Sequence, residues 1–262
     1  MTSFGEVAEQ LRRSTVSIQA GRNSGGSGLV WNRDAQSGLI VTNAHVARSN
    51  AMRVTLWDGR QYPAQLLAQD ARRDLATLRV AAPDLETAIA ADSGRLRPGE
   101  LVVAVGNPLG FTGALSTGTV HAVGQVKGLG RQPWVQANIR LAPGNSGGPL
   151  ADAHGRVVGI NTMVVTGGLG LAVPSEAIRR FVERGPETAR LGVAVQAVRP
   201  AGLLLLEVDL NSPAGRASLL PGDVLDHTLE ELEELLTHRG RTITLRFRRG
   251  ERHQTRTVTV QL

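Results

Sequence analysis

The sequence of 262 residues contains no cysteine, which excludes disulfide bonds and thiolate chemistry. Aromatic residues make up only 3% of the chain, with a single tyrosine among them. Because proteins hold single-stranded nucleic acid largely by stacking its bases on aromatic rings, we do not expect a nucleic-acid partner. Without disulfide bonds, the fold must be stabilised by packing alone. A hydrophobic fraction of 41% is enough to build cores.

Long hydrophobic runs are also missing. No apolar stretch approaches the roughly 18–20 residues that a membrane-spanning helix needs. The N-terminal segment includes Glu6, Glu9, Arg12 and Arg13, so it lacks the apolar core of a signal peptide. As written, the sequence predicts a cytoplasmic protein, and an extracytoplasmic location is the alternative if the chain is a processed fragment.

The net charge of +6 is concentrated near the C-terminus. Residues 239–256 hold seven arginines and one glutamate, so the rest of the chain is neutral. A basic segment of this kind can meet nucleic acid, anionic lipid or an acidic partner. The favoured interpretation is a solvated hairpin face beside the acidic residues Glu230, Glu231, Glu233 and Glu234.

Short apolar segments bounded by turn residues dominate the first two thirds of the chain. The expected strands are residues 14–18, 28–31, 38–42, 51–57, 61–68, 75–80, 101–106, 116–123, 134–138, 149–150, 157–163 and 169–173. Turns every 8–12 residues or so favour sandwiches or barrels over alternating β/α units. We expect two barrels, over about residues 14–95 and 96–175, with a short helix at 5–13 and a glycine- and serine-rich loop at 21–28.

A domain boundary follows the second set of strands. We predict a helix up to Arg184 with Ser175 as its cap, and Gly185-Pro186 ends it. The expected divisions are a first domain at 1–184, a linker at 185–189 and a small α+β domain at 190–262. The expected elements of the small domain are strands at 192–195 and 202–209, a helix at 229–236, and a hairpin of 242–248 with 255–262.

The run from Leu141 to Leu150 places Ser146 among glycines on a tight loop, with a proline on each side. Glycine reaches backbone angles that other residues avoid, so such a loop can aim several backbone N–H groups at one point. A nucleophilic serine beside such donors is what acyl transfer needs. An ordinary turn serine between two strands is the alternative.

Two residues upstream are candidate partners for Ser146. His45 stands where an apolar strand ends in a turn, and Asp74 begins another apolar strand, where its carboxylate could hold an imidazole in one tautomer. Asp70 and Asp84 lie in turns and are weaker candidates. The order histidine, aspartate, serine is that of chymotrypsin-type proteases, in which the first two come from one barrel and the serine from the other.

The other five histidines have no partners at metal-binding spacing. No His-x-His or His-Glu-x-x-His pattern occurs in the sequence. We therefore predict no metal site, and nothing in the sequence implies another cofactor.

Two parts of the chain resemble a known family. Residues 14–175 resemble the trypsin-like serine proteases of the HtrA (Deg) family. The matching runs are Gly26-Ser27-Gly28, Val41 to Val46, Asp74-Leu75-Ala76, Gly106 to Gly110, Pro143 to Pro149, Gly159 to Thr162 and Leu171 to Pro174. Residues 190–262 resemble the PDZ domain that follows the protease in that family, and the matching runs are Arg190 to Val193, Ser212 to Ala214 and Pro221 to Leu225.

The resemblance implies a mainly β, chymotrypsin-like double six-stranded barrel with serine endopeptidase activity and no cofactor. Ser146 would be the nucleophile, His45 the general base and Asp74 the group that orients it. Gly144, Asn145 and Ser146 would form the oxyanion hole. Trypsins carry aspartate where this chain has Asn145, and a neutral amide cannot pair with a freed N-terminus. We therefore expect activity to depend on loop ordering.

The family also implies substrates and partners. Unfolded or misfolded proteins would be cut after small apolar P1 residues, and the absence of acids between residues 135 and 145 gives no support for basic P1 residues. The PDZ-like domain is shortened, yet Leu191, Gly192 and Val193 would bind C-terminal peptides by strand addition. A homotrimer is implied as well. The alternative function is a non-cleaving, chaperone-like scaffold that holds partners through the PDZ-like domain.

Overall fold

A computed structural model describes residues 3–21, 25–49, 51–107, 113–129, 132–165, 168–185, 191–198, 202–236, 242–250 and 254–262. The chain divides into two compact units, Met1–Gly185 and Pro186–Leu262. Gly185 ends the last helix of the first unit with a φ of 75°, a conformation that favours glycine. Most of the predicted linker at 185–189 lies outside the described residues.

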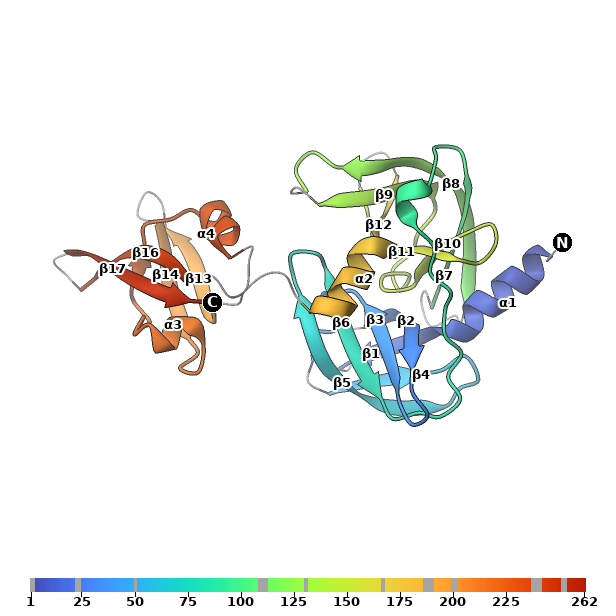
Figure 1. The fold of residues 1–262 in the computed structure, drawn as a ribbon, viewed down its shortest axis with the longest axis horizontal. Coiled ribbons are helices and arrows are strands. Elements are labelled where there is room, and N and C mark those ends of the chain that lie inside the picture. Colours follow the sequence, from blue (N-terminus) through green and yellow to red (C-terminus); the bar gives the residue numbers. More distant parts are fainter. Residues whose placement is uncertain are drawn as a thin grey trace. The chain divides into compact units, whose positions relative to one another are not determined.

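The first six strands form a closed barrel in the order β1-β2-β3-β6-β5-β4 (Figure 1). Their bounds are β1 Thr15–Ala20, β2 Gly25–Arg33, β3 Gly38–Thr42, β4 Met52–Thr55, β5 Gln61–Asp70 and β6 Leu75–Val80. Side chains such as Val16, Ile18 and Ile40 are buried together inside it. Alternation of buried and exposed positions along β1 fits a strand with one face on the core.

The prediction of a loop over residues 21–28 was wrong for its second half. β2 begins at Gly25 and pairs with β1, with Gln19 opposite Gly25 and Val16 opposite Gly28. A Cβ atom at Gly28 would stand 2.7 Å from a methyl group of Ile40. Glycine therefore serves here as a strand residue that lets the barrel close, which composition alone cannot distinguish from a flexible loop.

The second barrel repeats the architecture in the order β10-β11-β12-β9-β8-β7. Its strands are β7 Leu101–Gly106, β8 Ala114–Gln125, β9 Pro133–Ile139, β10 Pro149–Asp152, β11 Val157–Val164 and β12 Gly170–Pro174. β12 is buried at all five positions, so it reads as a continuous apolar run. The two closed six-stranded barrels confirm the predicted chymotrypsin-like double barrel.

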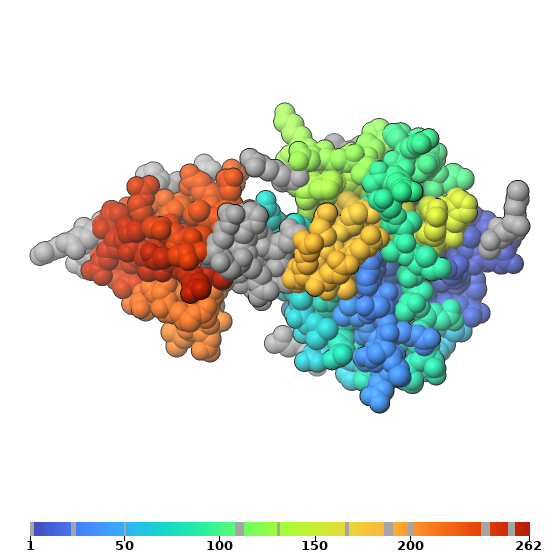
Figure 2. Space-filling model, viewed as in Figure 1, coloured from blue at the N-terminus to red at the C-terminus, as the bar shows by residue number. Residues whose placement is uncertain are grey.

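The described part of the first unit contains two α-helices. α1 (Phe4–Ser14) starts with a capping box between Ser3 and Glu6 and buries Val7 and Leu11. α2 (Ser175–Arg184) lies at the surface on the face seen in Figure 2. The prediction of Ser175 as a cap was wrong, because Pro174 takes that position and the Ser175 hydroxyl donates to the Ala91 carbonyl at 2.6 Å.

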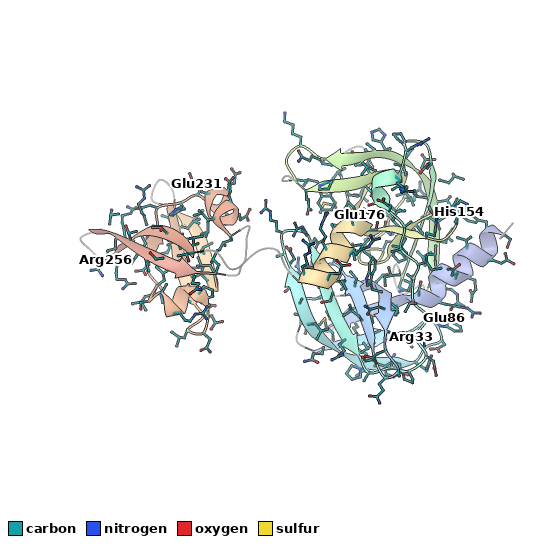
Figure 3. The ribbon with its side chains drawn as sticks, viewed as in Figure 1. Arg33, Glu86, His154, Glu176, Glu231 and Arg256 are labelled. Atoms are coloured by element: carbon teal, nitrogen blue, oxygen red, sulfur yellow. The ribbon has the colours of Figure 1, made fainter. Side chains whose placement is uncertain are left out.

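The first turn of α2 is tied to a 3₁₀ turn, η1 (Ser93–Arg95), that precedes the second barrel. Glu176, labelled in Figure 3, accepts hydrogen bonds from both the backbone and the hydroxyl of Ser93. A hydrogen bond with Glu176 and one from the Gly94 backbone hold the pKa of Asp92 below its ordinary value. These contacts anchor α2 to the chain that joins the barrels.

The described residues of the second unit form a five-stranded sheet in the order β13-β14-β15-β16-β17 and two short helices. Its elements are β13 Val193–Val198, β14 Gly202–Val208, α3 Pro213–Arg216, β15 Val224–Leu225, α4 Leu229–Leu235, β16 Thr242–Arg249 and β17 Gln254–Gln261. α4 begins with a capping box between Thr228 and Glu231, and the Thr228 backbone N–H holds the pKa of Glu231 below its ordinary value.

Two arginines of the basic hairpin have acidic partners within this unit. Arg249 contacts the buried carboxylate of Asp223 at 2.6 Å and lies 5.1 Å from the ring centre of Phe247. Arg248 contacts Asp226 at 2.8 Å. Part of the charge that stood out in the sequence therefore stabilises this unit internally. Arg239, Arg241 and Arg252 lie outside the described residues.

Candidate active site

Strand pairing brings His45 and Asp74 together. β3 and β6 are antiparallel with Thr42 opposite Ala76, so the residues just after β3 meet those just before β6. The Nδ1 atom of His45 lies 2.7 Å from one carboxylate oxygen of Asp74, and the His45 backbone N–H donates to the other oxygen at 3.0 Å. This arrangement holds the imidazole in one tautomer, with Nε2 left as the basic atom.

Asp74 is shielded from water more than its partner. Its side chain is 15% exposed, against 36% for His45. Its backbone φ is 54°, a left-handed conformation that aspartate tolerates better than most residues. The competing candidate Asp70 is buried instead as a turn cap that accepts from the backbone N–H groups of Arg72 and Arg73.

Ser146 lies on the loop between β9 and β10. Hydrogen bonds connect this loop to both barrels. The Ser146 carbonyl accepts from the backbone N–H of Ser27 in β2 at 2.8 Å, and the Gly147 N–H donates to the Asn161 carbonyl at 2.9 Å. Gly147 has a φ of 86°, and a Cβ atom there would stand 2.0 Å from the Ser27 carbonyl oxygen. Only glycine fits this close approach.

The hydroxyl of Ser146 donates to the backbone carbonyl of Thr162 in β11 at 2.9 Å. Within the described part of the chain it makes no hydrogen bond with His45. The structure thus brings His45 and Asp74 into contact and leaves the serine hydroxyl on a neighbouring acceptor. Proton transfer from this hydroxyl to His45 would require it to leave the Thr162 carbonyl.

The loop that precedes Ser146 offers backbone donors. Gly144 has a φ of 103°, and its carbonyl accepts from the Ser27 hydroxyl at 2.7 Å. Among the described residues, no acceptor is paired with the N–H of Gly144 or of Ser146. The Asn145 N–H donates to the Ala142 carbonyl at 3.0 Å, so Asn145 shapes the loop and is not available as an oxyanion donor.

A small pocket of about 300 Å³ opens beside Ser146. Its walls come from the serine loop and from β11, and they include Leu141, Thr162, Met163 and Val164. None of the described residues that line it carries a formal charge. The pocket is therefore suited to an apolar side chain of modest size.

Sequence reasoning gave no role to three polar residues that the structure places at the site: Ser27, Asn43 and Thr162. Each is buried, and each joins segments that are far apart in the sequence. The available signal was a polar side chain inside an otherwise apolar strand or at its end. That signal is weak because such a side chain also occurs in ordinary cores, where it is satisfied locally.

Comparison with known proteins fits this fold and geometry. The family model for the trypsin-like peptidase domain matches residues 26–160, and the chain belongs to that family. Within it, the chain groups with the HtrA serine proteases, as the following relatives show. A probable periplasmic serine endoprotease, DegP-like, from Marinomonas sp. (strain MWYL1) is 35% identical over 245 residues, which are 85% of this chain and 51% of that protein.

A second relative is the mitochondrial serine protease HTRA2 of Bos taurus, at 34% identity over 91% of this chain and 60% of that protein. The chain thus spans about half to three fifths of the length of these relatives. Among solved structures, the HtrA-type protease AlgW with decapeptide matches with a TM-score of 0.65 and 26% identity, over 99% of this chain and 98% of that one. AlgW with tripeptide matches with a TM-score of 0.66 and 28% identity, over 99% and 96%.

The described residues contain no group of three or more acidic or histidine side chains placed to hold a metal ion. None of their helices is long and apolar enough to cross a membrane.

Proposed function

We propose that this protein is a serine endopeptidase that cleaves unfolded or misfolded protein segments through an acyl-enzyme intermediate. The observation that carries the proposal is the His45–Asp74 contact of 2.7 Å beside the glycine loop that presents Ser146. Family membership supports it, as do relatives named as serine endoproteases.

In the first step, Ser146 Oγ bonds to the carbonyl carbon of the scissile peptide while His45 Nε2 takes the hydroxyl proton. The carbon–nitrogen bond then breaks, and His45 returns the proton to the leaving amine. Water releases the acyl group by the same sequence with water as the nucleophile. Asp74 stabilises the imidazolium, and the N–H groups of Gly144 and Ser146 stabilise the oxyanion.

We infer a preference for small apolar P1 residues. The described lining of the pocket of about 300 Å³ beside Ser146 contains no charged residue, and Leu141 and Val164 narrow the pocket with apolar side chains. A buried Lys or Arg side chain would lose its hydration there without a partner. Cleavage of a peptide library, read by mass spectrometry, tests this: Ala or Val at P1 is expected, and basic residues at P1 would contradict it.

We also propose that the second unit captures C-terminal peptides. β13 pairs with β14 alone among the described strands, so its other edge can accept an added strand. At Gly192 (φ 79°) a Cβ atom would stand 2.0 Å from the Ser212 side chain, so only glycine fits at the start of this edge. Leu191 is buried in the core, so its contribution is to hold this loop in place, while Val193 begins the strand edge.

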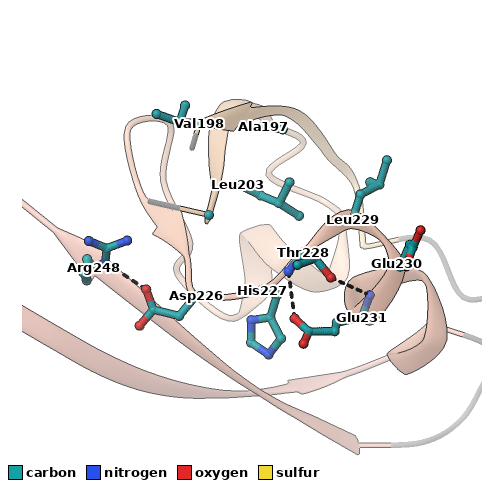
Figure 4. Close-up of a pocket in the computed structure, with 11 residues that line it drawn as sticks. Ala197, Val198, Leu203, Asp226, His227, Thr228, Leu229, Glu230, Glu231 and Arg248 are labelled. Carbon is teal, nitrogen blue, oxygen red and sulfur yellow. Dashed lines mark hydrogen bonds and ion pairs between the residues drawn. The ribbon is translucent and has the colours of Figure 1, made fainter. Parts of the chain in front are cut away.

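A cavity of about 640 Å³ lies where the end of β13 approaches the start of α4 (Figure 4). Val198, Leu203 and Leu229 give it apolar walls, and Glu230 and the Asp226–Arg248 pair lie at its border. Titration with labelled peptides that end in apolar residues tests the capture proposal. Saturable binding is expected, and its absence at millimolar peptide would overturn peptide capture and leave the peptidase proposal intact.

Casein digestion decides between the peptidase and the non-cleaving scaffold. Wild-type protein is expected to cleave, and Ser146→Ala is expected to be slower by a factor on the order of 10⁶. Equal cleavage by both proteins would point to a contaminant. If neither cleaves at several temperatures while casein aggregation is suppressed, the scaffold function replaces the enzyme.

Location and assembly stay predictions for this chain. A cytoplasmic protein is the prediction from the sequence, whereas two relatives are named as periplasmic and mitochondrial. A homotrimer and regulation through loop ordering are proposed from the family resemblance. Cell fractionation and sedimentation velocity test location and assembly directly.

A further inference from the structure

Asn43 lies two residues before His45, and its side chain is fully buried. Its Nδ2 atom donates to the backbone carbonyl of Asp74 at 2.9 Å and to the hydroxyl of Thr162 at 2.8 Å. Asp74 belongs to the first barrel and Thr162 to the second. One amide group therefore connects the residue that orients His45 with the residue whose carbonyl holds Ser146.

The orientation of this amide is determined by its neighbours. Both hydrogens on Nδ2 are used, and Oδ1 is buried with no partner among the described residues. Turning the amide over would place its oxygen against the Asp74 carbonyl, where two acceptors would repel each other. Buried polar atoms are nearly always paired, so an orphan oxygen calls for an explanation. The explanation is that the two hydrogen bonds from Nδ2 fix the orientation of the amide and so leave Oδ1 without a partner.

We propose that Asn43 is a positioning residue of the active site, an inference that rests on the peptidase function proposed above. Asp74 has a left-handed backbone, and the bond from Asn43 holds its carbonyl on the side of β3. The carboxylate of the same residue then accepts both N–H groups of His45. Asn43 thus secures Asp74 at the backbone while His45 engages its side chain.

The second bond extends this action to the nucleophile. The Thr162 hydroxyl accepts from Asn43, and the Thr162 backbone carbonyl accepts from Ser146. Asn43 touches neither the substrate nor the reacting atoms, so it acts through these two residues. Loss of its amide should loosen the alignment of His45 and Ser146 without changing the pocket that binds the substrate.

The test is Asn43→Ala, with kcat and KM measured on a peptide substrate. A misplacement of about 1 Å can cost about 10² in rate, so we expect kcat to fall by 10- to 100-fold, roughly, while KM changes less than about threefold. The proton on His45 Nδ1 gives a second readout by NMR. It should resonate far downfield in the wild type, and in Asn43→Ala it should move upfield and exchange faster with water.

Ser175→Ala is the matched control. Ser175 is fully buried and hydrogen-bonded to Ala91, but it lies on α2, outside the proposed catalytic machinery. It should lose stability comparably and keep kcat and the His45 proton signal. If Asn43→Ala behaves like this control, the positioning role is overturned. If Asn43→Ala does not fold, Thr162→Val replaces it as the test variant. This substitution removes one acceptor of the Asn43 amide and keeps Asn43 itself, and the same two measurements are made on it.

The outcome separates this inference from the peptidase proposal. The NMR signal needs no turnover and can be recorded in the Ser146→Ala background. If wild-type protein cleaves casein but the His45 signal is unchanged by Asn43→Ala, only the positioning role fails. If no form of the protein cleaves casein, the peptidase proposal fails, and the NMR comparison still decides whether Asn43 positions the Asp74–His45 pair.

Discussion

The Ser146 hydroxyl donates to the backbone carbonyl of Thr162 across 2.9 Å, so the nucleophile of the proposed reaction is held by β11 in the free protein. The pairing of β10 with β11 ends at Ile160, so a substrate strand that pairs beside Thr162 would offer its own P1 N–H group to the same carbonyl. Substrate binding would then release the hydroxyl toward His45. We therefore predict that substrate binding and activation of Ser146 are coupled.

A substrate with an N-methylated P1 residue cannot make that exchange. Compared with the unmethylated peptide, it should lose about 5- to 10-fold in kcat, the value of one ordinary hydrogen bond, because Ser146 keeps its bond to Thr162. Steady-state kinetics on the matched pair of peptides would measure this. The coupling is contradicted if methylation raises KM and leaves kcat as it was. Methylation of the P1′ nitrogen is not a suitable control, since it alters the leaving group, so P4 methylation serves instead.

Ser27→Ala should impair the oxyanion site from a distance. The Ser27 hydroxyl holds the Gly144 carbonyl at 2.7 Å and accepts from the Asn107 backbone at 2.9 Å. That carbonyl belongs to the peptide unit between Gly144 and Asn145, so without the Ser27 hydroxyl the loop that carries the Gly144 and Ser146 N–H groups loses an anchor. We expect kcat to fall, by at most about 10²–10³, the cost of one lost oxyanion donor, with little change in KM. Ser37→Ala, on an exposed turn of the same barrel, should leave kcat unchanged. A larger KM with normal kcat would argue against this role.

Leu141→Ala should widen the substrate pocket. Leu141 lines the pocket and packs close to Gly170, where a Cβ atom would stand 2.9 Å from its Cδ1. Removal of the branched end of Leu141 creates room for one or two further methylene groups of the substrate. We therefore expect kcat/KM for substrates with Leu or Phe at P1 to rise by about 10-fold relative to kcat/KM for substrates with Ala at P1. Competition between matched peptides measures the ratio. Leu101→Ala, at an exposed position of β7, is the control and should leave this ratio of kcat/KM values unchanged. An unchanged ratio in Leu141→Ala would contradict the prediction that Leu141 limits the size of the pocket.

Glu9 should make stability depend on pH in the acid range. Hydrogen bonds from Arg12 and Arg13 lower the pKa of Glu9 from 4.5 to about 2 in the folded protein. Because the folded pKa is the lower one, the stabilisation is present above pH 4.5 or so and is lost as the pH falls toward 2.

The measurement is the difference in thermal unfolding temperature between wild type and Glu9→Gln. The difference should be small, constant near neutral pH, and should vanish as the pH approaches about 2. Glu183→Gln, at an exposed position on α2, should show no such trend. A difference that persists unchanged at pH 2 would mean that the two arginines do not stabilise the Glu9 carboxylate.

Much of the fold was readable from local patterns. Apolar segments separated by glycine, proline and aspartate predicted the twelve strands of the barrels, because a short strand and its turn are specified by a few neighbouring residues. Local patterns did not predict that β2 begins with the residues from Gly25 to Gly28. Glycine signals a loop locally, and only pairing with β1 turned these residues into a strand.

The sequence by itself determined which residues can carry the chemistry: a serine in a glycine loop, and a histidine and an aspartate next to apolar strands, in chymotrypsin-type order. Only the tertiary structure decided how they are held. The Asn43 amide reaches Thr162 across 119 positions, and the Ser27 hydroxyl reaches Gly144 across 117. Hydrogen bonds between residues so distant leave no periodicity in the sequence, since they exist only after two barrels have closed against each other. For the same reason the resting position of Ser146 on Thr162 belongs to the fold and not to the motif.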